Sequence, residues 1–185
     1  HHLGLDYAIL TDHDSLAGLP ASGYADDTLF LVGAEITCAD NSHCLALGLK
    51  RLIPKGLSPQ QVIDEIRRAG ALSILAHPYD RGSPLFRTHY PWRDWSVSGF
   101  DALEMWNFLV DWAEGMTNWR QALRAYRSPG HTLDGPNPDG LRHWDEVNRR
   151  RYRMKRAPLP VIGGVDAHGH FLYRRSLSTV RTYLW

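Results

Sequence analysis

The chain has 185 residues and a mass of 21.0 kDa, and 43% of its residues are hydrophobic while 22% are charged. These values are close to those of globular proteins, so they exclude an intrinsically disordered chain, a collagen and a coiled coil. No apolar run approaches the ~20 residues of a membrane span, and a net charge of +1 does not suggest a dedicated nucleic-acid binder.

Short apolar runs rich in strand-forming residues recur along the chain, with one clear helical pattern among them. The expected strands cover residues 7–10, 29–32, 43–49, 72–76, 100–103, 160–164 and 180–184. Ser58 and Pro59 have the pattern of an N-cap and a first helical residue, apolar residues then repeat at helical spacing, and Gly70 ends the helix. Strands that alternate with helices predict an α/β fold with a mainly parallel sheet.

The composition changes between residues 108 and 158, where tryptophans stand among charged residues and Pro-Gly clusters punctuate the chain. This stretch predicts a helix near 110–126, an exposed loop, and a second helix from Leu141 to about Arg151. We expect one domain over residues 1–185, with a helical and loop excursion at about 108–158.

Four of the apolar strands are followed by a histidine, an aspartate or a glutamate. In barrels of parallel strands, polar residues at the carboxyl ends of the strands converge on one mouth, where the chemistry takes place. Imidazoles and carboxylates gathered in this way suit zinc, manganese or iron. The candidate metal ligands are His13, Glu35, His43, His77, Asp166 and His168. Any one of these histidines taken alone could instead be an ordinary core or surface residue.

Other polar or reactive groups have a simpler interpretation. Cys38 and Cys44 cannot build a disulfide framework, so we expect the protein to work in a reducing compartment, the cytoplasm. We expect the two cysteines themselves to be small buried residues. The basic run over residues 149–156 could grip phosphates or nucleic acid, but a solvated helix end is favoured, because the rest of the chain does not share the bias. Four histidines without a motif around them are expected at the surface: His89, His131, His143 and His170. Of these, His170 is a weak additional candidate for a metal ligand.

Four stretches resemble motifs of the polymerase-and-histidinol-phosphatase (PHP) domain family. Residues 4–18, with Thr11-Asp12-His13-Asp14, resemble its second motif, and Gly33-Ala34-Glu35-Ile36 followed by His43 resembles its glutamate and the histidine after it. Ala76-His77-Pro78 is similar to the family's "AHP" strand end. Residues 163–169 resemble its closing "GGSDAHG", with Val165 where serine is usual. The four stretches follow the family order along nearly the whole chain.

The resemblance implies a distorted (β/α)7 TIM-like barrel that holds two or three divalent metal ions and hydrolyses phosphoesters of small substrates. By position, His13 and His168 would bind one ion and Glu35 would bridge the other two. His43 and His77 would complete one of these, and Asp166 would help to hold the other. The residues with an implied catalytic role are Glu35, His77, Asp166 and His168. Weaker candidates for contacts to substrate or to the ligands are Asp12, Arg81, Glu104 and Asn107, the last two because they resemble an "E-x-x-N" stretch of some small PHP hydrolases.

The sequence departs from the family at its start, where PHP domains carry a strand that ends in His-x-His. No such motif precedes Tyr7, so the resemblance implies a barrel truncated at the N-terminus, with truncation at the C-terminus left open. The chain would be a fragment or a degenerate copy, and we expect it to hydrolyse a generic aryl phosphate poorly. Two alternatives remain open: a non-catalytic module, and a hydrolase of carboxylic or carbamate esters. Neither a membrane nor a nucleic acid is expected as a partner.

Overall fold

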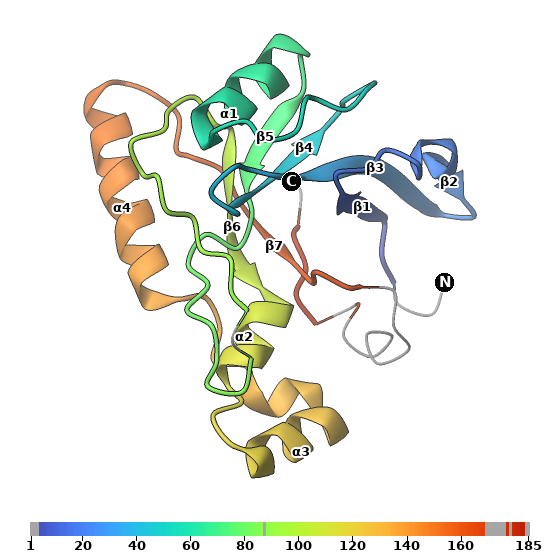
Figure 1. Cartoon of the computed structure of the whole chain (residues 1–185), viewed down its shortest axis with the longest axis vertical. Coiled ribbons are helices and arrows are strands. Elements are labelled where there is room, and N and C mark those ends of the chain that lie inside the picture. The colour runs from blue at the N-terminus through green and yellow to red at the C-terminus, as the bar shows by residue number, and fades with distance from the viewer. Residues whose placement is uncertain (1–3, 87, 169–176, 178, 184–185) are drawn as a thin grey trace. The chain divides into compact units, whose positions relative to one another are not determined.

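A computed structural model describes residues 4–86, 88–168, 177 and 179–183, and it is a mixed α/β structure (Figure 1). The elements form two compact units, and each unit is built from two separate stretches of chain. The first unit comprises residues 1–76 and 92–102, and the second comprises residues 77–91 and 103–185. None of the helices in the described ranges is both long and apolar enough to cross a membrane.

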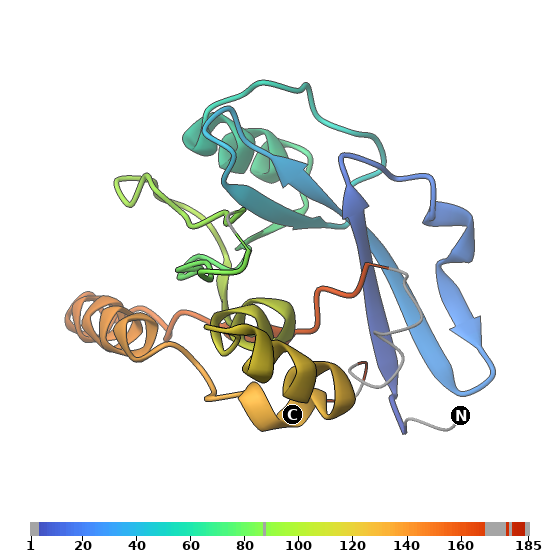
Figure 2. The same cartoon turned by 60° about the horizontal axis from the view of Figure 1, so that its bottom comes forward.

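The first unit contains five strands, which pair side by side (Figure 2). They are β1 (Tyr7–His13), β2 (Gly23–Ala25), β3 (Thr28–Thr37), β4 (His43–Leu47) and β5 (Leu72–Leu75). Strand β1 is parallel to β3, whereas β2 and β4 are antiparallel to β3, and β5 is antiparallel to β4. The prediction of a mainly parallel sheet is therefore wrong for this unit. Only residues 38–42 join β3 to β4, and so short a connection permits only an antiparallel return.

The helix predicted from Ser58 is confirmed as α1 (Pro59–Arg68). The Ser58 hydroxyl accepts a hydrogen bond from the Gln61 N–H at 3.4 Å, and the Gln61 side chain accepts from the Ser58 N–H at 2.9 Å, which completes a capping box. Gly70, with φ of +71°, follows the end of the helix, as the sequence predicted.

Small residues allow the central strands β3 and β4 of this sheet to pack closely. Ala34, Cys44 and Ala46 are fully buried, and a Cβ on Gly33 would lie only 2.4 Å from the Ala46 carbonyl oxygen. Cys38 and Cys44 are free and buried, as expected. Desolvation by burial raises the pKa of the Cys38 thiol to about 11 and raises the pKa of Cys44 as well, so both thiols keep their protons at neutral pH in the metal-free chain.

In the second unit, β6 (Ala102–Asn107) and β7 (Val161–Gly164) pair in parallel, with a register shift between Glu104 and Trp106. The helices are α2 (Phe108–Glu114), α3 (Trp119–Arg127) and α4 (Pro138–Arg153). Among the described residues, Leu19–Ala21 in the first unit and Pro129–Thr132 in the second form short 3-10 turns.

Two helix predictions in this unit are corrected. The single helix expected over 110–126 is two helices, because α2 ends at Gly115 and the Asn118 side chain caps α3 by accepting from two backbone N–H groups. A Cβ on Gly115 would lie 2.4 Å from the Thr132 carbonyl oxygen, so the backbone is closely packed at the break. Helix α4 begins three residues earlier than predicted, at Pro138, because Asn137 is its N-cap and proline suits the first helical position.

The strand predicted over residues 180–184 is absent from its described part, residues 180–183. The Thr182 hydroxyl accepts from the Gly163 N–H at 2.9 Å and donates to the Gly163 carbonyl oxygen at 3.0 Å. A side chain thus satisfies backbone groups of β7 that a neighbouring strand would otherwise bond. Val180 is buried against the same glycine, and Leu184 lies outside the described residues.

Candidate metal centre

Three of the predicted ligands lie at one edge of the sheet in the first unit. His13 ends β1 and is the register partner of Glu35 on the parallel strand β3. His43 begins β4 and pairs with Thr37, two residues beyond Glu35. Because β4 runs antiparallel to β3, its amino end lies beside the carboxyl end of β3. The β3–β4 hairpin therefore places His43, at the start of β4, beside the carboxyl ends of β1 and β3. The sequence had predicted that all these ligands would lie at the carboxyl ends of parallel strands.

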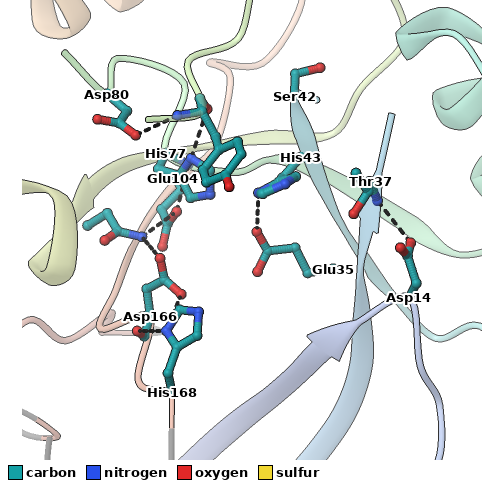
Figure 3. A network of polar contacts seen from close by, with 12 residues as sticks. Asp14, Glu35, Thr37, Ser42, His43, His77, Asp80, Glu104, Asp166 and His168 are labelled. Carbon is teal, nitrogen blue, oxygen red and sulfur yellow. Dashed lines mark hydrogen bonds and ion pairs between the residues drawn. The ribbon is translucent and has the colours of Figure 1, made fainter. Parts of the chain in front are cut away.

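The geometry of this group, which we call the His-Glu-His cluster (His13, Glu35 and His43), fits a divalent cation. Figure 3 shows Glu35 and His43 of the cluster. One ligand atom from each residue lies within 4.8 Å of the others. The His43 Nδ1 is 2.8 Å from the Glu35 Oε1, and the His13 and His43 rings meet edge to face with centroids 5.0 Å apart. Glu35 and His43 are each only 5% exposed, whereas His13 is exposed. Two imidazoles and one carboxylate are a donor set that zinc, manganese and iron accept.

Asp14 fixes the backbone beside this cluster, a role that the sequence reasoning missed. Its side chain accepts a hydrogen bond from the Thr37 N–H at 3.0 Å, and its own N–H donates to the Glu35 carbonyl oxygen at 2.8 Å. Its φ of +45° is a conformation that aspartate tolerates better than most residues. These bonds clamp the end of β1 to the end of β3, and thereby hold His13 and Glu35 in register.

The second unit gathers another set of predicted residues around the buried Glu104 (Figure 3). The Glu104 carboxylate accepts from the His77 N–H at 2.7 Å and from the Asn107 Nδ2 at 3.1 Å. The Asn107 Nδ2 also lies 3.4 Å from the Asp166 Oδ2. Asn107 thus links two carboxylates, and Glu104 holds the backbone of His77.

Burial raises the pKa of the Glu104 carboxyl to about 7, because a charged form is disfavoured away from water. The charge of Asp166 raises this pKa further, while His77 and the Asn107 hydrogen bond lower it. Glu104 therefore titrates near neutral pH, unlike an ordinary glutamate.

Two histidines of this unit are oriented by carbonyl groups. The His77 Nδ1 lies 3.2 Å from the Tyr90 carbonyl oxygen, and the His168 Nδ1 lies 3.0 Å from that of Asp166. A carbonyl oxygen only accepts, so each Nδ1 carries the proton and the lone pair of each neutral ring is at Nε2. This is the usual way in which a protein prepares a histidine to bind a metal. His77 and Asp166 both have positive φ, at +30° and +55°.

The remaining candidates are placed as follows. Arg81 forms an ion pair with Glu114, with its Nε 2.9 Å from the Glu114 Oε2, and Asp12 is exposed. His89 is exposed, as expected, and His170 and the side chain of His131 lie outside the described residues. His143, which was expected at the surface, is part-buried and is hydrogen-bonded to Tyr79.

No protein-family model matches the chain. It is 32% identical over 79 residues to the uncharacterized protein MJ1587 of Methanocaldococcus jannaschii; the match covers 41% of the chain and 46% of that relative, so the chain spans about half the relative's length. Its structure is similar to that of a "putative metal-dependent phosphoesterase" from Bifidobacterium adolescentis, with a TM-score of 0.56 and 17% identity over 99% of this chain and 88% of that one. At that identity the similarity is one of fold, and the chain therefore has the fold of the Bifidobacterium protein.

Proposed function

We propose that this chain is a metal-dependent hydrolase of the PHP type, with part of a distorted TIM-like barrel, that cleaves phosphoesters of small substrates. The observation that carries the proposal is the His-Glu-His cluster, in which a buried carboxylate and two imidazoles offer ligand atoms within 4.8 Å of one another. The fold shared with the Bifidobacterium protein, which is described as a "putative metal-dependent phosphoesterase", supports the same activity.

Glu35 and His43 would hold the ion from the buried side of the cluster, and His13 from its exposed side. A divalent ion in such a site makes water nucleophilic at neutral pH and stabilises negative charge on phosphoryl oxygens. The Glu35 carboxylate would neutralise part of the cation's charge and fix its depth. The exposed His13 would keep the site open to a phosphate group.

The assignment of His77, Asp166 and His168 as further ligands stays a prediction. The support for this prediction is that hydrogen bonds within the second unit orient each of these side chains. A carbonyl oxygen orients each of the two histidines, and Asn107 contacts the Asp166 carboxylate. In this proposal Glu104 and Asn107 hold the predicted ligands His77 and Asp166 in position and do not contact the substrate.

Glu35→Gln tests the proposal, because glutamine keeps the shape of the side chain but removes the negative charge. The matched control is Glu146→Gln, which changes an exposed glutamate of α4 in the same way. Each variant is loaded with Zn²⁺ or Mn²⁺, dialysed, and assayed for metal per chain and for hydrolysis of bis(p-nitrophenyl) phosphate. We expect Glu35→Gln to lose at least ~90% of the bound metal and of any turnover, since even residues around metal ligands change affinity 10–100-fold.

Unchanged metal content in Glu35→Gln, with a melting curve like that of the wild type, would refute the proposed centre. Metal lost with Glu35→Gln but no phosphoester turnover by the wild-type chain would favour the non-catalytic module. Turnover of p-nitrophenyl acetate without turnover of the phosphodiester would favour an esterase.

A further inference from the structure

The last turn of α4 and the residues that follow it carry an unusual concentration of positive charge. We call residues 149–156 the basic segment. It contains six cationic residues and no acidic one: Arg149, Arg150, Arg151, Arg153, Lys155 and Arg156. The remaining chain has 21 − 6 = 15 basic and 20 acidic residues, a net charge of −5. The near-neutral total of +1 therefore hides a strong separation of charge along the chain.

The cations of the basic segment are not paired with carboxylates. Arg67, Arg68, Arg81 and Arg142 each form an ion pair, but none of the six cations does so with any carboxylate in the described part of the chain. Arg151 donates instead to the Ala157 carbonyl oxygen at 2.6 Å, and the other five side chains are exposed. Their charge is therefore available to a partner.

The charge exceeds what stability of the helix requires. One or two cations in a last turn complement the helix dipole. Arg149 and Arg153 are four residues apart, and Arg150 and Arg153 are three apart, so these like charges lie next to one another on the helix surface. Each such pair costs about 0.2–0.5 kcal/mol. The number of cations therefore exceeds what the helix dipole alone calls for.

An exposed aromatic side chain lies in the middle of these cations. Tyr152 is 84% exposed, between Arg151 and Arg153, and Met154 is 64% exposed. Unstacked bases stack on exposed aromatic rings while neighbouring cations contact the phosphates. A membrane surface would instead require an apolar stripe along the helix, and the large apolar side chains that the basic segment exposes are Tyr152 and Met154.

We propose that the basic segment binds single-stranded nucleic acid, with its arginines on the phosphates and Tyr152 stacked on a base. The net charge of the whole chain argued against such a partner only because it averages this segment with an acidic remainder. The inference is independent of the metal centre, because binding requires none of the His-Glu-His cluster.

Fluorescence anisotropy with a fluorescein-labelled dT 20-mer tests this proposal on the 185-residue chain in EDTA. We expect a dissociation constant in the micromolar range at 50 mM KCl, which weakens with salt with a log–log slope of about −2 to −3. Arg149→Glu/Arg150→Glu should weaken binding at least ~10-fold. Tyr152→Ala should weaken binding of the single strand about 5-fold or more and leave binding of a 20-bp duplex unchanged, because a stacked duplex offers no free base.

Two matched variants control these experiments. Arg67→Glu/Arg68→Glu changes the same charge in the last turn of α1, and Tyr24→Ala removes a tyrosine that is 77% exposed on β2; both should bind like the wild type. Equal losses in the test and control variants would overturn the proposal, as would no binding of the 20-mer by the wild-type chain. Sedimentation with vesicles of 30% phosphatidylserine, without binding of the 20-mer, would identify a membrane partner instead.

Discussion

The Tyr79 hydroxyl donates a hydrogen bond to the His143 Nδ1 at 2.8 Å, across 64 residues of sequence. Burial raises the pKa of Tyr79 and lowers that of His143, so the phenol keeps its proton and the neutral imidazole accepts the hydrogen bond. The Asn137 side chain also donates to the Tyr79 carbonyl oxygen at 3.2 Å. Helix α4 thus holds the chain two residues after His77.

Tyr79→Phe removes this hydrogen bond and leaves the ring in place. We expect the free energy of unfolding to fall by about 1 kcal/mol, the usual net contribution of such a bond. Urea denaturation measures the change. Tyr24→Phe, at an exposed position, should change it by less than ~0.5 kcal/mol, and equal effects of the two variants would contradict the role of His143.

Gly33→Ala should destabilise the first unit by about 2 kcal/mol or more. The added Cβ would lie 2.4 Å from the Ala46 carbonyl oxygen and 2.7 Å from the Leu47 Cδ2, so β3 and β4 would have to separate. Thermal melting monitored by circular dichroism tests this expectation. Gly130→Ala is the control, because no atom lies within 4 Å of its added Cβ, and a loss of stability there as large as at Gly33 would rule out the steric explanation.

Glu104 should make the stability of the metal-free chain depend on pH. Its folded pKa of about 7 lies above the ordinary value of 4.5, so the folded state binds the proton more tightly than the unfolded state. The stabilisation is complete below about pH 4.5 and is lost as the pH rises through 7, by up to ~1.4 kcal/mol per pH unit. Urea denaturation in EDTA at several pH values should show this slope in the wild type and a weaker one in Glu104→Gln. Identical slopes would mean that Glu104 does not titrate in this range.

Asp111→Ala should cost more than ~2 kcal/mol, because three donors converge on this buried carboxylate. They are the Trp106 Nε1 at 2.8 Å and the Asp134 and Gly135 N–H groups at 3.0 Å each. Donors left without an acceptor carry their full desolvation cost. The exposed Asp145→Ala should be nearly neutral in the same urea assay, and a neutral Asp111→Ala would show that water replaces the carboxylate.

The sequence predicted local features well, because their causes are local. Ser58, Pro59 and Gly70 define α1 within thirteen residues, and the structure agrees with all three. The grouping of His13, Glu35 and His43 followed from motif order, although the strand directions assumed for it were partly wrong. The short link between β3 and β4 could have corrected them.

Long-range contacts were beyond the sequence reasoning. Nothing near His143 indicates that Tyr79 will reach it, and nothing in the Thr182 neighbourhood indicates that its hydroxyl will occupy the backbone groups of Gly163. Helix and strand propensities depend on the residues of one segment. These contacts join segments that are distant in the sequence, so tertiary packing decides them.

The two compact units are interleaved along the chain, and this determines the order in which they can be completed. Residues 92–102 belong to the first unit, where Asp101 accepts a hydrogen bond from the Ser73 N–H at 2.8 Å and the Ser98 N–H donates to Gln60 at 2.9 Å. During synthesis the first unit therefore cannot close until residue 102 has left the ribosome, by which time residues 77–91 of the second unit have already emerged. Cleavage after Ala76 would release β1 to β5 without residues 92–102, and therefore without the hydrogen bonds that Asp101 and Ser98 make to Ser73 and Gln60.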